Sequence, residues 1–143
     1  MSTLSAAISA SASALGAERT RIEAAVSNLA NAESTQSANG QPYKRRDVIL
    51  SAEPVNSFDA AMGRSTATGV KVARVVEDQS EYRRRYEPGH PDADADGFVS
   101  LPNVDASTEM VDMIGAARAY QANLAAIGII RDLISKALEL GRS

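Results

Sequence analysis

The N-terminal segment places an apolar residue at every seventh position. The repeat runs from Ile8 through Leu15 and Ile22 to Leu29, and this spacing brings apolar side chains onto one side of a helix in a coiled coil. With neighbouring apolar positions, the predicted packing stripe comprises Leu4, Ile8, Leu15, Ile22, Val26 and Leu29. The pattern predicts a helix over residues 3–30, about 42 Å long at the usual rise per residue. Its flank is rich in Ser and Ala, so we expect a neighbouring backbone to approach it closely.

The C-terminal segment carries a second stripe with the same spacing. Its members are Met110, Met113, Tyr120, Leu124, Ile127, Ile134 and Leu138. Asp105 or Ser107 can cap the start of the helix, and Glu109 and Asp112 then place negative charge in its first turns, where the helix dipole favours it. Gly141 is a natural C-terminal stop. We therefore expect the two terminal helices to pair as an antiparallel coiled coil.

The middle of the chain has weak periodicity. Its five prolines lie between positions 42 and 102, which excludes one long helix. Alternating patterns predict strands at residues 43–50, 70–76 and 82–86. The predicted fold class is therefore mainly α, with an N-terminal coiled-coil helix (residues 1–31), an irregular, partly β middle region (32–106) and a C-terminal coiled-coil helix (107–143).

The apolar surface of the C-terminal segment is wider than one helix–helix seam. Val111, Ile114 and Ile129 lie beside the stripe and extend it beyond what a single partner helix covers. Two interpretations remain open at this point. Either other protein chains cover this surface, or the middle region covers it within one monomer.

Composition restricts the possible functions. The net charge of −3 provides no overall attraction to nucleic acid. With no cysteine, the chain forms no disulfide and no thiolate metal site. The first residues have no Lys or Arg before their apolar part and do not resemble a Sec signal peptide. We expect a protein that either stays in the cytoplasm or is exported by another route.

The segment DADADG is the strongest candidate for a metal site. Asp92, Asp94, Asp96 and Gly97 match the start of a calcium loop, but the position that needs a bidentate Glu holds Asn103. Prolines stand where the flanking helices of such a loop belong: Pro88, Pro91 and Pro102. A structural turn is the favoured interpretation, with Asp side chains bonding the local backbone and Gly97 at positive φ.

An enzymatic function has no positive support in the sequence. His90 is the only histidine, so it has no second histidine or cysteine with which to form a transition-metal site or a nucleophilic dyad. No phosphate-binding glycine loop, dinucleotide fingerprint or hydrolase elbow occurs. We expect a protein that is not an enzyme and needs no cofactor.

Several motifs resemble those of one family. The segment SNLANA, from Ser27 to Ala32, resembles the motif that closes the N-terminal helix of bacterial flagellar axial proteins. In the same order follow PYKRRDV, GVKV, YEPGHPDADADGFV, LPNVD, EMVDMI and ARAYQAN. Together they resemble the proximal-rod proteins of this family, although residues 57–69 contain no such motif. The motif residues that we single out are Asn28, Asn31, Pro88, Gly89, His90, Pro91, Asp92, Asp94, Asp96, Gly97, Pro102, Asn103 and Asp105.

The resemblance implies a structural subunit of the rod of the flagellar basal body, which crosses the periplasm. Such a subunit assembles with copies of itself, with rod proteins of the FlgB, FlgF and FlgG types, and with the export-gate adaptor FliE. It is exported by the flagellar type III apparatus without a Sec signal peptide. The terminal helices then form the assembly interface, in the inner wall of an axial tube.

Two functions from other classes are alternatives. A cytosolic helical-hairpin adaptor would bind partner helices without polymerising. A calcium-responsive binding module would use the aspartate loop as its sensor.

Overall fold

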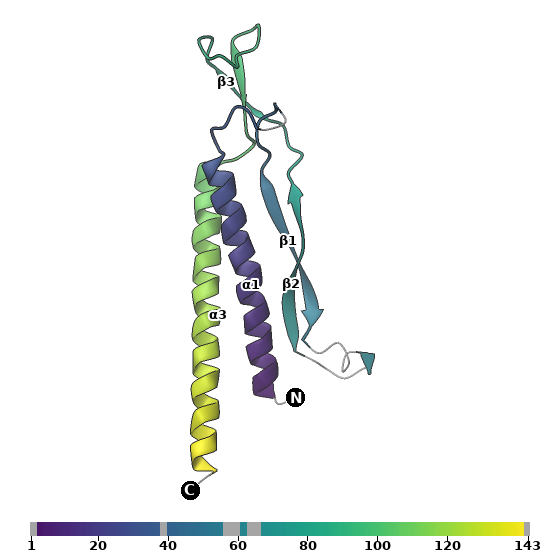
Figure 1. Cartoon of the computed structure of the whole chain (residues 1–143), viewed down its shortest axis with the longest axis vertical. Helices are drawn as coiled ribbons and strands as arrows, with labels where there is room; N and C mark the ends of the chain where they lie inside the picture. Colours follow the sequence, from purple (N-terminus) through teal and green to yellow (C-terminus); the bar gives the residue numbers. More distant parts are fainter. Residues whose placement is uncertain (1–2, 38–39, 56–60, 63–66, 142–143) are drawn as a thin grey trace.

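The computed structural model describes residues 3–37, 40–55, 61–62 and 67–141. Two long helices, α1 (Thr3–Ala30) and α3 (Ala106–Leu140), lie side by side and run antiparallel (Figure 1). The predicted helix over residues 3–30 and the predicted antiparallel pairing are confirmed. Coiled-coil packing of the large stripe residues stays a prediction.

Side-chain caps define the ends of α3. Of the two candidate N-caps, Asp105 is the one used: its carboxylate accepts a hydrogen bond from the backbone N–H of Thr108 at 2.8 Å. Gly141 ends the helix as predicted, and its N–H donates to the carbonyl of Ala137. Its φ of −78° is right-handed, so this stop does not depend on the conformational freedom of glycine.

Small and polar residues occupy the buried part of the two helices. Within their described side chains, the fully buried ones are Ala17, Ala25, Asn28, Glu109 and Ala116. The predicted stripe residues are half-buried or exposed instead. One neighbouring helix covers only one side of its partner, which leaves the large apolar side chains of the two helices partly exposed.

A long two-stranded ribbon lies along α1. Strands β1 (Arg46–Pro54) and β2 (Thr68–Glu77) pair antiparallel, with an irregularity between Ile49 and Leu50. The ribbon contacts α1 on the side away from α3 (Figure 1). The predicted strand at 70–76 is confirmed. The strand predicted at 43–50 begins later, because Arg45 N–H donates to the side chain of Asn103 at 2.8 Å instead of to a neighbouring strand.

The ribbon touches α1 at its small residues. The Ser13 hydroxyl accepts a hydrogen bond from Val70 N–H at 3.0 Å, and a Cβ at Gly69 would lie 2.6 Å from the same oxygen. This contact confirms the expected close approach of a backbone to the Ser- and Ala-rich flank of α1.

A short hairpin lies at the end of the molecule where α3 begins. Strand β3 (Arg83–Tyr86) confirms the predicted strand at 82–86, and it pairs antiparallel with β4 (Phe98–Leu101), which was not predicted. The large buried apolar side chains lie in β4 and in the segment between β4 and α3: Val99, Leu101, Pro102 and Val104. The main apolar core therefore lies at this end, beside the start of α3.

Two further findings concern the chain as a whole. Of the 57–69 segment, only residues 61–62 and 67–69 are among those that the structure describes. No helix in the described ranges is both long enough and apolar enough to cross a bilayer.

The first prediction concerns the approach of β2 to α1. Gly69→Ala should lower the free energy of unfolding by about 1 kcal/mol, because Ser13 must rotate away and lose its bond to Val70. Gly16→Ala, within α1, is the matched control. Its new methyl group has no neighbouring atom within 4 Å, so this change should stabilise the protein by about 0.5–1 kcal/mol. Urea unfolding measures both values.

Removing the Ser13 hydroxyl should also relieve the crowding. Ser13→Ala is therefore expected to reduce the cost of Gly69→Ala when the two changes are combined. Equal costs of Gly69→Ala in both backgrounds would contradict this account.

Candidate functional site: a polar junction between the terminal helices

Two polar side chains are buried where α1, α3 and the start of β1 meet. Asn28 near the end of α1 is 1% exposed, and Glu109 in the first turn of α3 is 2% exposed. A buried amide or carboxylate destabilises a fold unless hydrogen bonds replace its lost water. Together with Arg45 these residues form what we call the polar junction.

The side chain of Asn28 uses its full hydrogen-bonding capacity. Its Oδ1 accepts from the Tyr43 hydroxyl at 2.9 Å and from Arg46 N–H at 2.8 Å. Its Nδ2 donates to the Arg46 carbonyl at 2.9 Å and to Glu109 Oε2 at 2.9 Å. One side chain thereby connects α1 to both the first residue of β1 and the first turn of α3.

The second oxygen of Glu109 faces Arg45. Arg45 Nε donates to Glu109 Oε1 at 2.6 Å, and the same guanidinium lies 3.6 Å from Asp112. Burial by itself lowers the pKa of Arg45, but the hydrogen bond and charge of Glu109 raise it, and the net direction is upward. Glu109 was expected to act as a charge that favours the helix dipole; its burial shows that its main partners are Arg45 and Asn28.

Asn103 stabilises the segments next to the junction. Its Oδ1 accepts from Arg45 N–H at 2.8 Å, and its Nδ2 donates to the carbonyl of Asp78 at 3.1 Å and the hydroxyl of Ser80 at 2.8 Å. The residue that replaces the Glu of a calcium loop is thus an amide that joins three backbone segments. A carboxylate could not donate the last two bonds.

Other motif residues surround the junction. Asn31 donates to the carbonyl of Ser27 at 2.8 Å and so caps the end of α1. The carbonyl of Pro102 accepts from Arg83 Nε at 2.9 Å. The structure therefore brings five of the predicted motif positions to one end of the helix pair: Asn28, Asn31, Pro102, Asn103 and Asp105.

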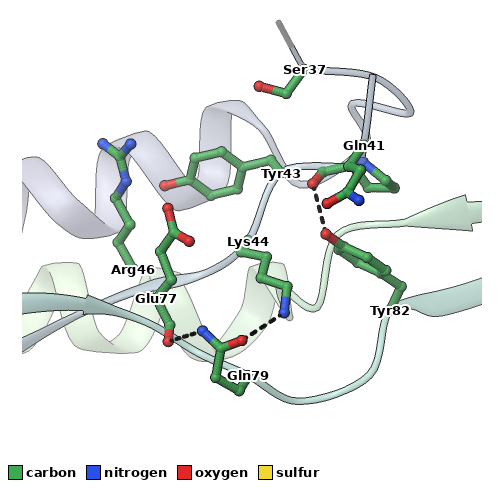
Figure 2. A pocket seen from close by; sticks show the side chains of 9 residues that line it. Ser37, Gln41, Tyr43, Lys44, Arg46, Glu77, Gln79 and Tyr82 are labelled. Carbon is green, nitrogen blue, oxygen red and sulfur yellow. Dashed lines mark hydrogen bonds between the residues drawn. The ribbon is translucent and has the colours of Figure 1, made fainter. Parts of the chain in front are cut away.

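An open polar pocket of about 310 Å³ lies beside the junction (Figure 2). Tyr82 donates to the carbonyl of Pro42 at 3.2 Å, and Lys44 donates to Gln79 at 3.0 Å. Gln79 in turn donates to the carbonyl of Glu77 at 3.0 Å. Because these lining groups bond to one another and to backbone, the pocket walls connect the start of β1 to the end of β2.

The aspartate segment forms the predicted turn. Asp94 Oδ1 accepts from the N–H groups of Asp96 at 3.0 Å and Phe98 at 2.8 Å, and Gly97 has φ +81°. The backbone hydrogen bond from Phe98, with help from the nearby Arg84, holds the pKa of Asp94 below its usual value. The interpretation of this stretch as a structural turn is confirmed.

The three aspartates point to different partners. Asp92 accepts from Thr35 at 2.7 Å and Gln36 at 2.5 Å, which ties the turn to the segment after α1. Asp96 is exposed. His90 Nδ1 accepts from the N–H of Asp92 at 3.1 Å. In the part of the chain that the structure describes, no group of three or more His, Asp or Glu side chains is placed to hold a metal ion.

The remaining motif positions lie in the same loop. Pro88 packs close to Gly97, whose Cβ would lie 3.1 Å from that of Pro88. Gly89 and Pro91 are exposed. These positions shape the turn and lie outside the polar junction.

The arginines of β3 alternate between the two faces of the strand. Arg83 and Arg85 both reach Glu33, at 3.7 and 2.7 Å, whereas Arg84 pairs with Asp94 at 2.6 Å. The three cations therefore lie on opposite faces of the strand and have acidic partners within the chain.

The second prediction tests the polar junction. Asn28→Leu should lower the free energy of unfolding by about 3–5 kcal/mol, because it leaves the buried Glu109 without its amide donor and two backbone groups unpaired. The matched control is Asn123→Leu, since Asn123 is half-buried and bonds to a carbonyl of its own helix. The control should change stability by about 0.5 kcal/mol or less. Chemical denaturation followed by circular dichroism compares the two; similar losses would show that the junction does not stabilise the fold.

The third prediction concerns the turn. Gly97→Val should cost about 1–3 kcal/mol, because a β-branched residue is strained at positive φ and its Cβ would lie 2.9 Å from the ring of Tyr86. Gly89→Val, in the same loop, adds a Cβ with no neighbour within 4 Å and should be tolerated. Unfolding midpoints and the near-ultraviolet signal of tyrosine report the difference. Equal behaviour of the two variants would show that the turn does not require Gly97.

Comparison with known proteins places this architecture in one family. Residues 95–140, from the aspartate turn to the end of α3, match the model of the flagellar basal body rod FlgEFG protein C-terminal region. Over 130 residues the chain is 45% identical to flagellar basal-body rod protein FlgC of Salmonella typhimurium, covering 91% of this chain and 92% of that protein.

Relatives from distant bacteria show the same relationship. FlgC of Bacillus subtilis is 39% identical over 145 residues, covering 94% of this chain and 96% of its own. FlgC of Borreliella burgdorferi is 33% identical over 147 residues, with 96% and 97% covered. With similarity at this level along nearly the whole length, the chain belongs to the FlgC family of flagellar basal-body rod proteins and is a structural subunit of the rod.

Proposed function

We propose that this subunit belongs to the proximal part of the rod, where its terminal helices pack against those of neighbouring subunits. The assembled rod acts as an axial drive shaft that transmits torque and encloses the export channel. One observation carries this proposal: α3 is apolar on the side away from α1 as well as on the side that faces it.

The exposed side of α3 is extensive. Val111 is 69% exposed and Ile129 is 62% exposed. The two are separated by eighteen residues, or five helical turns, so they lie on one face. Other large apolar side chains of α3 are also exposed: Met110, Ile114, Leu124, Leu133, Leu138 and Leu140. A helix that is hydrophobic all round is normally buried, so this surface is suited to packing against other chains.

Similar helices of other subunits are the proposed partners. The match of residues 95–140 to a C-terminal region named for FlgE, FlgF and FlgG supports a helix of shared type in several axial proteins. We propose contacts with copies of this chain, with FlgB-, FlgF- and FlgG-type rod proteins and with FliE. Nucleic acid is not a proposed partner, because the chain is net negative.

Family membership also supports a location and an export route. The proposed location is the rod crossing the periplasm, reached through the flagellar type III export apparatus without a Sec signal peptide. A cytosolic helical-hairpin adaptor is not favoured, since the relatives of this chain are rod proteins.

The fourth prediction tests the exposed face of α3. Ile129→Asp should leave the fold of the subunit intact, because this side chain is mostly exposed, but should abolish rod assembly by placing a charge in a subunit contact. Gln121→Asp adds the same charge at an exposed polar position of α3 and serves as the matched control. Each variant is expressed in cells that lack their own copy of the rod gene.

Swimming and electron microscopy of isolated basal bodies report the outcome. Ile129→Asp cells are expected to spread no further than the deletion strain and to lack rods, whereas Gln121→Asp cells swim. Complete rods and normal swimming of the Ile129→Asp cells would contradict the proposed interface. If the wild-type chain fails to restore rods in the deletion strain, the proposed function itself is contradicted.

A further inference from the structure

Small side chains make up the fully buried apolar part of α1 and α3. The fully buried apolar side chains of the two helices, within the described residues, are Ala17, Ala25 and Ala116. Helices hold a register when large side chains interlock as knobs in holes, or when a buried polar residue must find its partner. The large stripe residues of both helices are only half-buried or exposed, so the buried polar contact is the more specific of these two devices here.

The polar junction specifies one alignment of the two helices. Glu109 receives Asn28 Nδ2 on one oxygen at 2.9 Å and Arg45 Nε on the other at 2.6 Å. A slide of α3 by one helical turn, about 5.4 Å, would move Glu109 from the level of Asn28 to that of Ala24 or Ala32. Neither alanine side chain can donate a hydrogen bond, so the buried carboxylate would lose its amide partner.

We propose that the polar junction of Asn28, Glu109 and Arg45 sets the antiparallel register of the terminal helices and thereby the axial position of the surfaces that a subunit presents to its neighbours. This inference rests on the proposed function, because register matters most where subunits stack along an axis. It assigns the junction a role in the specificity of assembly, in addition to its role in stability.

The register of the helices determines how far α3 protrudes at the end of the helix pair opposite the polar junction. α3 has 35 residues and α1 has 28, so α3 extends about 10 Å beyond the start of α1 (Figure 1). The protruding end carries the exposed Leu138 and Leu140. A slide of one turn would change the length of this protrusion by about half and would misplace its apolar side chains relative to the next subunit.

A measurement of the helix register distinguishes a role of the junction in the specificity of assembly from a role in the stability of the subunit. The chain has no cysteine, so single cysteines at the exposed Ala12 of α1 and Ala106 of α3 take two spin labels that lie about 28 Å apart along the axis of the helix pair. Pulsed electron spin resonance on the purified full chain then measures the straight-line distance between the labels, most of which lies along that axis. Assembly of the same chains is followed by swimming and by imaging basal bodies.

The test variant removes both charges of the junction together. Arg45→Met combined with Glu109→Met leaves no unpaired buried charge, and paired apolar replacements of this kind often preserve stability. We expect the helix content to persist, the distance distribution to broaden or shift by about 5 Å, and rods to be absent or truncated. The matched control, Arg19→Met with Glu23→Met, removes an exposed ion pair of 2.9 Å on α1 and should retain one distance and normal rods.

Each outcome decides between the alternatives. One narrow, wild-type distance together with normal rods in the junction variant would overturn the inference and leave the proposed function standing. If the junction variant loses helix content, Glu109→Gln provides the decision, because it keeps the shape and an acceptor while removing the charge. A broadened distance for Glu109→Gln supports the inference, and an unchanged distance with normal assembly contradicts it.

Discussion

The buried contact between Asn28 and Glu109 joins residues 81 positions apart in the chain. It joins the two ends of the middle region, which begins where α1 ends and finishes where α3 begins. Because a carboxylate without partners is costly to bury, the first turn of α3 is stable in this position only while Asn28 and Arg45 are in place. The start of the β1–β2 ribbon depends on the same contact, since Asn28 also bonds both backbone groups of Arg46.

The two terminal helices have different roles in the subunit. α1 lies between α3 and the ribbon (Figure 1), and its Ser and Ala residues allow both neighbours to approach. α3 contacts α1 along one side, and large apolar side chains remain exposed on the other. The exposed apolar surface of such a subunit suits the proposed packing against neighbouring subunits.

Hydrogen bonds and ion pairs hold the middle region together beside its small apolar core. Asp94 bonds the backbone of its own turn, whereas Asn103 and Arg85 bond Ser80 and Glu33, which are distant in the sequence. Exposed ion pairs of this kind contribute little each, but the backbone bonds specify shape. Of the aspartates that resemble a metal loop, Asp94 is explained by turn geometry and Asp92 by its bonds to Thr35 and Gln36. The turn leads directly into β4, in which Val99 is buried.

Local patterns along the chain were enough to predict the bounds of α1, two candidate caps for α3, the strands β2 and β3 and the turn at Gly97, because each follows from propensity or periodicity within a few residues. The strand β4 was missed, since four residues carry too little periodic signal. The roles of Glu109, Asn103 and Asn28 were not predictable in this way. An acidic residue in the first turn of a helix has the same sequence signature whether it faces water or a buried amide, and the choice depends on which distant segment lies against it. Periodicity likewise indicated that the apolar stripes need partners, while the folded arrangement determined which side of each helix is already covered, because burial depends on contacts between segments far apart in the chain.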